Sequence, residues 1–201
     1  MKKLVVFAIF CSAFSTLKAQ ETGTFGVSAG INVSNMSFKS QGVSASLTSL
    51  VGFKGYVFYD LPLGGSFSLE NELGYDGMGA KLNDPTTGIT YTESLNYLTL
   101  AILPKYNIPE TGLSLYLGPS LGYLLSAKST GGGQSGSDTD NYNSIDLFGE
   151  IGASYFLPMG FGISARYMAG LTNIEKDPQG GETAHNSAFS ITLAYKFNAG
   201  K

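Results

Sequence analysis

Eight charged residues lie within stretches that are otherwise apolar or rich in glycine and hydroxyl side chains. The set comprises Lys54, Glu70, Glu72, Lys105, Asp146, Glu150, Arg166 and Lys196. Four are acids and four are bases, so the set as a whole is neutral. Charges enclosed in a narrow space are tolerated only when they are paired and hydrogen-bonded. We therefore expect these side chains to form a network of ion pairs.

The residue types needed for acyl or proton transfer come together only near the C-terminus. His185 is the only histidine, and Ser187 and Asp177 are close to it in sequence, but no feature orients the three as base, nucleophile and orienting acid. We interpret His185 as an exposed residue of a loop. Asp138 and Asp140 lie in a segment that faintly resembles a calcium loop, without its closing glutamate or its fixed glycine. We predict no enzyme activity, no metal site and no cofactor.

The charged residues lie on eight stretches in which apolar residues alternate with small or polar ones, the period of a β-strand. These stretches span residues 23–35, 49–60, 66–78, 93–106, 113–126, 144–157, 161–171 and 187–197. The connectors between them are alternately long and short, and the short ones are rich in proline and glycine. Each stretch is about as long as a tilted strand needs to be to cross a bilayer. The pattern predicts an all-β fold, an eight-stranded antiparallel up-and-down transmembrane β-barrel.

Composition indicates which face of these strands points outward. Charged residues make up 13% of the chain, whereas a soluble domain carries about 25%. The first strand has Thr24, Gly26 and Ser28 on one face and Phe25 and Val27 on the other. A face of small residues suits the narrow interior of an eight-stranded barrel, so we expect the apolar face to meet lipid. The opposite arrangement, a soluble lipocalin-like binder, is the alternative.

Aromatic residues gather at the strand ends next to the short connectors, where a periplasmic girdle would lie. They are Tyr59, Tyr106, Tyr155, Phe161, Tyr195 and Phe197. Bacterial barrels place short turns in the periplasm and long loops outside. With eight strands, both termini are then expected in the periplasm.

This strand arrangement brings specific charges together. A count around a turn near Leu63 places Lys54 opposite Glu72, and a similar count around Met159 places Arg166 within one pleat of Glu150. Eight strands close a barrel too small for a wide channel, so we expect the charges to form a plug. The alternative is a gated or selective pore that opens when a pair is broken.

The first 19 residues have the features of a cleaved secretory signal peptide. Lys2 and Lys3 precede an apolar run, and cleavage is expected between Ala19 and Gln20. The barrel domain would then span residues 20–201. The only cysteine, Cys11, falls in the signal peptide, which excludes disulfides and a thiol nucleophile in the remainder.

The charge of the chain argues against nucleic acid as a partner. Removing the three lysines of the first 19 residues from the 12 basic residues leaves 9 against 15 acidic ones, a net charge of −6. The expected partners are outer-membrane lipid, the barrel-assembly machinery during insertion, and a protein at the surface or in a secretion system. We expect a monomer.

Several sequence blocks resemble the PorT-like outer-membrane β-barrel proteins of Bacteroidetes-type bacteria. The blocks are FGVSAGINVSN at 25–35, LENELGY at 69–75, YLTL at 97–100 continuing to PKY at 104–106, GPSLGYLL at 118–125 and RYMAGLTNI at 166–174. Pro104 departs from the family pattern, in which the proline comes earlier in the fourth strand. The resemblance implies an outer-membrane location and an eight-stranded barrel, and it links the chain to a family named for a member involved in type IX protein secretion.

Two functional hypotheses follow. In the first, the barrel is a structural or interaction protein whose extracellular loops meet a partner, because loops on a rigid scaffold carry specificity. In the second, it is a transport component, either a narrow pore or an accessory to type IX secretion. Fold alone does not choose between them.

Overall fold

The protein is described here from a computed structural model, which defines residues 23–40, 43–176, 178 and 182–197. The expected signal peptide and its cleavage site at Ala19 and Gln20 lie outside the described residues. No helix in the described part of the chain is long and apolar enough to span a membrane.

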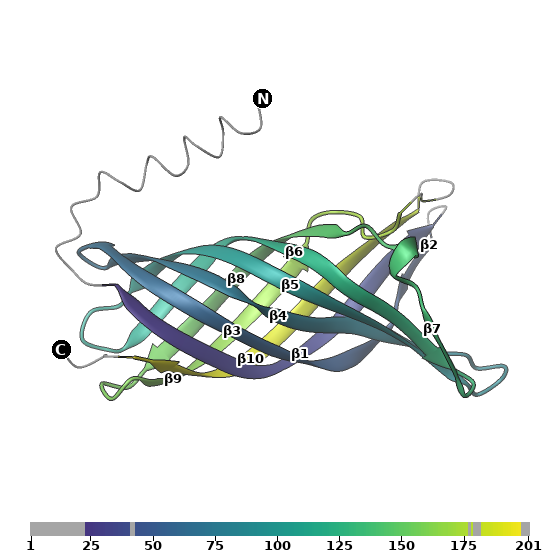
Figure 1. The fold of residues 1–201 in the computed structure, drawn as a ribbon, viewed down its shortest axis with the longest axis horizontal. Coiled ribbons are helices and arrows are strands. Elements are labelled where there is room, and N and C mark those ends of the chain that lie inside the picture. Colours follow the sequence, from purple (N-terminus) through teal and green to yellow (C-terminus); the bar gives the residue numbers. More distant parts are fainter. Residues whose placement is uncertain (1–22, 41–42, 177, 179–181, 198–201) are drawn as a thin grey trace, which may run out of the picture.

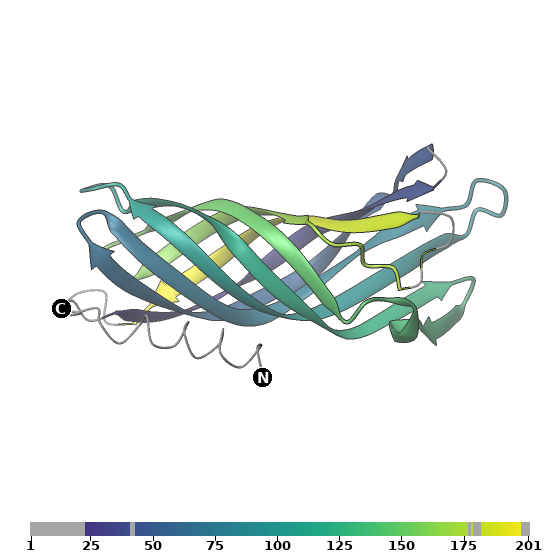
Figure 2. The ribbon, with the colours of Figure 1, turned by 90° about the horizontal axis from the view of Figure 1, so that it is seen from above.

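Eight long strands form the wall of a barrel, and two short strands extend it (Figures 1 and 2). The wall consists of β1 (Thr24–Ser40), β3 (Thr48–Gly64), β4 (Phe67–Asn83), β5 (Thr90–Asn107), β6 (Leu113–Gly131), β8 (Ile145–Phe156), β9 (Phe161–Gly170) and β10 (Thr183–Lys196). The short strands are β2 (Val43–Ser46) and β7 (Gln134–Ser137), and a short 3-10 helix, η2, spans Thr139–Asn141. β2 pairs with β1, and β7 pairs with β6.

The sheet closes on itself without a free edge in the wall. Each long strand pairs antiparallel with its neighbours in sequence, and β1 also pairs with β10 from Gly26 and Lys196 to Lys39 and Thr183. The eight-stranded antiparallel barrel predicted from the alternation is therefore confirmed.

Most strands are longer at the end remote from the short turns than the alternation indicated. β1 continues to Ser40 and β6 to Gly131, and β5 begins at Thr90. Much of the first three expected loops is thus strand, and β2 and β7 add to it. The extensions mix apolar residues such as Met36, Phe38 and Leu82 with lysine, serine and asparagine, so the alternation there is too short and irregular to show that backbone pairing continues.

The outer face of the wall is apolar. Large apolar side chains point away from the barrel and are widely exposed, for example Leu193 at 71% and Leu117 at 64%. The inner face holds the buried side chains, polar and apolar alike. Exposed apolar surface on this scale is unfavourable in water, and it matches the lipid-facing band of an outer-membrane barrel.

Aromatic pairs surround the barrel near its short turns. The ring centroids lie 4.6 Å apart in Phe25 and Tyr59, 5.3 Å apart in Phe67 and Tyr106, and 4.9 Å apart in Phe161 and Tyr195. Each pair joins two neighbouring strands. Such an aromatic band suits the boundary between hydrocarbon and headgroups.

Candidate functional site

The barrel interior is the candidate site, because it collects most of the charge that the strands carry. Seven of the eight charged residues named from the sequence are buried there, and the side chain of Lys196 is 17% exposed at the turn end. Two further acids, Asp60 and Asp76, are also buried in it. The interior therefore holds six acids and four bases among its described residues, so the expected neutrality was wrong.

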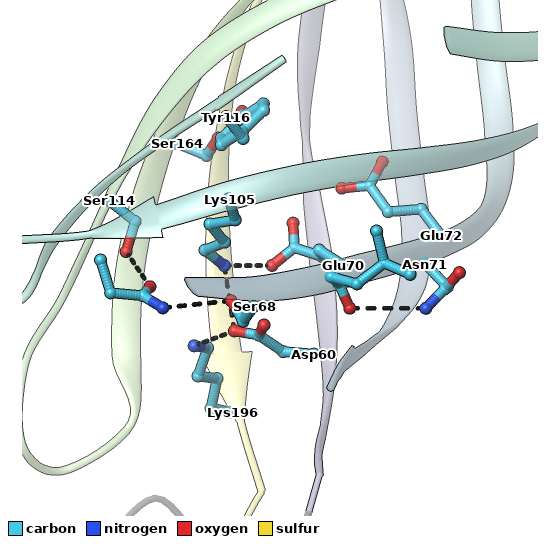
Figure 3. A network of polar contacts seen from close by, with 12 residues as sticks. Asp60, Ser68, Glu70, Asn71, Glu72, Lys105, Ser114, Tyr116, Ser164 and Lys196 are labelled. Atoms are coloured by element: carbon cyan, nitrogen blue, oxygen red, sulfur yellow. Dashed lines mark hydrogen bonds and ion pairs between the residues drawn. The ribbon is translucent and has the colours of Figure 1, made fainter. Parts of the chain in front are cut away.

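The first group of charges lies at the end with the short turns. The Nζ of Lys105, on β5, donates to Glu70 and to Oδ2 of Asp60 at 3.1 Å, and the Nζ of Lys196 lies 2.7 Å from the same Asp60 oxygen (Figure 3). Both ammonium groups also lie against the ring of Phe156. Two lysines and two acids from four strands thus neutralise one another in a shared cluster.

The second group spans the width of the barrel. Arg166, on β9, donates to both carboxylate oxygens of Glu72, on β4, at 2.6 Å, and its Nη1 lies 2.8 Å from Oε2 of Glu150. The guanidinium also contacts the Tyr56 and Tyr116 hydroxyl groups. β4 and β9 stand four strands apart around the ring of eight, on opposite walls. A bidentate arginine of this kind fixes geometry as well as charge, so this ion pair bridges the lumen.

The third group corrects the predicted partner of Lys54. Its Nζ lies 2.7 Å from Oδ1 of Asp76, which also accepts a hydrogen bond from the Asn32 amide at 3.0 Å. Lys54 is opposite Asp76, not Glu72, because the hairpin turns two residues later than expected. Gly64 and Gly65 adopt φ of 104° and 61°, a conformation that glycine tolerates and that moves the turn beyond Leu63.

Asp146 lies apart from these three groups. It accepts hydrogen bonds from the Thr172 hydroxyl at 2.6 Å and from the Asn186 amide at 3.0 Å. No base forms an ion pair with it in the described part of the chain. The structure therefore does not join Asp146 to the charge network in which the sequence placed it.

An apolar layer fills the lumen toward the other end, and the sequence analysis missed it. Its large members are Met36, Met78, Leu95, Tyr97, Leu124, Phe148, Met168 and Ile174, all buried. Tyr97 and Phe148 meet edge to face, with ring centroids 6.0 Å apart. Ile174 comes from the connector after β9 and folds inward, where its backbone N–H donates to Ala184. The available signal was the inward Met78 and Met168 in the third and seventh expected strands, together with Met36 directly after the first.

His185 is not the exposed loop residue that we expected. It lies in β10, is half-buried, and is paired in register with Ser37 of β1. Ser187 is two residues further along the same strand, and Asp177 lies outside the described residues. Within residues 23–40, 43–176, 178 and 182–197, no three histidine, cysteine or acidic side chains are grouped as metal ligands would be.

Several solved structures are similar in fold to this chain. Neisserial surface protein A is similar over 88% of this chain and 100% of its own, with a TM-score of 0.55 and 17% identity. Ail, the attachment invasion locus protein of Yersinia pestis, is similar over the same shares, with a TM-score of 0.51 and 19% identity. Ail in complex with the heparin analogue sucrose octasulfate gives a TM-score of 0.50 and 18% identity. At these identities the likeness concerns the fold alone.

Sequence comparison identifies the family directly. No curated protein matches the chain. A family model described as an outer membrane protein beta-barrel domain matches residues 18–176, most of the chain. The family and the apolar outer face agree on an outer-membrane location. The chain belongs to the outer membrane protein beta-barrel domain family.

Proposed function

We propose that this protein is a closed outer-membrane barrel that presents a recognition surface on its long hairpins, and that it does not conduct solutes. The observation that carries the proposal is the filled lumen. Three groups of paired charges occupy the part near the short turns, and an apolar layer closes the part beyond them. A continuous water path would have to cross both.

The paired charges and the apolar layer oppose the passage of solutes for different reasons. Removing one partner of a buried ion pair leaves an uncompensated charge and costs about 3–5 kcal/mol. The apolar layer offers few hydrogen bonds to water, and cavities of that kind stay dry. A solute moving through the barrel would have to break charge pairs and then enter an apolar layer.

The end beyond the apolar layer has the order that a recognition surface needs. A backbone bridge joins Tyr142 to Glu175, and the Asn143 amide donates to the carbonyl groups of Asn173 and Glu175 at 3.0 and 2.9 Å. These contacts tie the segment after η2 to the connector after β9. Loops held in this way on a rigid barrel can present a fixed shape.

The remaining parts of the proposal concern topology and processing. Cleavage after Ala19 would release a secretory signal peptide and leave residues 20–201 as a monomeric barrel. Both termini would lie in the periplasm, with the short turns, as in other bacterial barrels. The barrel-assembly machinery would insert the chain into outer-membrane lipid. We place the chain among PorT-like proteins on the sequence blocks given above, and we propose no catalysis and no cofactor.

Conductance in planar bilayers tests the closed lumen. The purified protein, checked for folding by its change of gel mobility on boiling, should give no steady current, whereas a general porin reconstituted in parallel should. Steady conductance from the unmutated protein would overturn the proposal in favour of a narrow pore.

A deletion strain tests the recognition role against secretion. We expect weakened adhesion or envelope integrity with unchanged cargo at the cell surface. Replacing the β6–β7 hairpin tip (131–134) by a short turn in the complementing gene should reproduce that phenotype without loss of the folded barrel. Loss of surface cargo in the deletion strain would favour an accessory of type IX secretion instead.

A further inference from the structure

A cavity opens at the mouth of the barrel beyond the apolar layer. Its volume is about 370 Å³, within the range of small-molecule sites. Met36 and Ala80, both fully buried members of the apolar layer, form its floor. Phe38, Leu82 and Tyr91 form its walls at the ends of β1, β4 and β5. Leu82 and Tyr91 are 52% and 41% exposed, so the cavity is open at the rim and closed below.

Leu47 adds a further apolar side chain, and two residues with polar groups, Glu93 and Tyr142, complete the lining. The Oε1 atom of Glu93 is buried and has no hydrogen-bond partner among the described residues. The Ser129 and Tyr142 hydroxyl groups interact with this carboxylate, but neither donates to Oε1, and a buried acceptor without a donor is unfavourable. The cavity therefore lacks one hydrogen-bond donor at a defined position.

The surrounding charge indicates the kind of donor. Burial raises the pKa of the Tyr142 phenol, and the negative charges of Glu93, Asp138 and Glu175 raise it further. On the neighbouring strands Lys81 and Lys128 pair with Thr92 and Ser94, the residues on either side of Glu93. Since side chains alternate along a strand, these lysines lie on the opposite face. A cation is therefore favoured at Glu93.

We propose that the mouth of this barrel binds a small amphiphilic amine, with its apolar body against Phe38, Leu82 and Tyr91 and its ammonium group on Glu93. The closed floor means that the amine is held and not passed into the charged lumen. Access from outside the cell rests on the proposed orientation, but binding to the purified barrel does not. A failure of the site is thus distinguishable from a failure of the proposed function.

Dansylcadaverine, an apolar fluorophore with a primary amine, is a suitable probe, and its N-acetylated form is the neutral control. Both are titrated into the protein in phosphatidylcholine nanodiscs, with empty nanodiscs subtracted. We expect saturable binding of one amine per barrel, with the acetylated form at least about tenfold weaker, because a charge-assisted hydrogen bond is lost. Binding that does not exceed the empty discs, or equal binding of the two probes, would overturn the proposal.

Two variants locate the site, and one serves as a control. Glu93→Gln should bring the affinity for the amine down to that for the acetylated form, and Leu82→Gln should weaken both probes. Glu110→Gln makes the same charge change in a short turn at the opposite end and should bind like the unmutated protein. Heat-modifiable gel mobility establishes that each variant is folded. A Glu93→Gln barrel that is folded and still prefers the amine contradicts the assignment.

Discussion

The two halves of the lumen exclude water by opposite means. Near the short turns, the strands direct five acids and four bases inward, and the ion pair of Arg166 with Glu72 joins opposite walls. The sixth buried acid, Asp146, lies nearer the mouth. Toward the mouth, the same inward positions carry methionine, leucine and aromatic side chains. In the charged half, the geometry of the ion pairs determines which side chains meet. In the apolar half, the packing of side-chain volumes determines it. The barrel thus combines one region that is sensitive to single charges with one that is sensitive to volume.

The largest expected effect comes from Arg166→Met. The change leaves Glu72 and Glu150 buried without their common cation, so it should lower the free energy of unfolding by about 3–5 kcal/mol. Denaturant unfolding in detergent, followed by gel mobility, measures it. The triple variant Arg166→Met, Glu72→Gln, Glu150→Gln is the control and should recover part of the loss. An Arg166→Met barrel as stable as the unmutated protein would refute the view of the charged half as a coupled unit.

Leu95→Ala tests the apolar half of the lumen, because it removes side-chain volume without changing any charge. Leu95 is fully buried in the apolar layer, and truncating such a side chain costs about 2–5 kcal/mol. The loss should add to that of Arg166→Met, because the two residues share no partner. Leu98→Ala, on the outer face of the same strand, is the matched control and should cost less in detergent. Strong non-additivity would mean that the two halves are one cooperative unit.

Lys54→Ala tests whether the charged half or the apolar half of the lumen blocks the passage of ions. It breaks the ion pair with Asp76 but leaves the apolar layer in place, so we expect no steady conductance in planar bilayers. Combining it with Leu95→Ala and Met168→Ala should give measurable current. Conductance from Lys54→Ala alone would show that the charges are the only barrier.

The smallest effect is expected at the hairpin between β4 and β5. The Asp84 carboxylate accepts hydrogen bonds from the backbone N–H of Thr86 at 2.8 Å and from the Thr87 hydroxyl at 2.7 Å, and these hold the pKa of Asp84 below its usual 3.8. A lowered pKa means that the turn is stabilised above pH 3.8 and loses this contribution as the pH falls through the lower value. The protection of the Thr86 amide, taken as its exchange rate relative to the intrinsic rate at the same pH, should therefore fall only in strong acid, and Asp84→Asn should remove this pH dependence of the protection.

The sequence predicted the barrel well because lipid imposes a simple rule on one face of every strand. Alternation gave the strand number, the closure and the inward phase of residues such as Glu72 and Arg166. It did not predict which charges meet. The partner of Lys54 depends on where a glycine turn reverses the chain, and the contact between Arg166 and Glu72 crosses the barrel between strands that never pair.

The apolar layer was hidden for a related reason. An inward methionine or leucine is compatible with any barrel, and only the three-dimensional meeting of β1, β4, β5, β6, β8, β9 and β10 makes it a layer. Ile174 shows most clearly what the alternation cannot predict, since it belongs to a connector in which apolar and polar residues do not alternate as in a strand. Residues Asp60 and Asp76 were missed although their even positions matched those of Lys54 and Glu72.

The cross-lumen contact between Arg166 and Glu72 also bears on how the barrel acquires its register. A strand displaced by one residue would turn its apolar face inward and its polar face toward lipid, which is unfavourable. A strand displaced by two residues keeps every side chain on its proper face, so the hydrophobic pattern cannot detect the error. That displacement moves a side chain by about 6.6 Å along the strand, which separates groups that lie 2.6 Å apart in the native pair. The buried ion pair therefore distinguishes the native register from one displaced by two residues, although both present the same apolar face to lipid. It does so only after β9 has joined the wall.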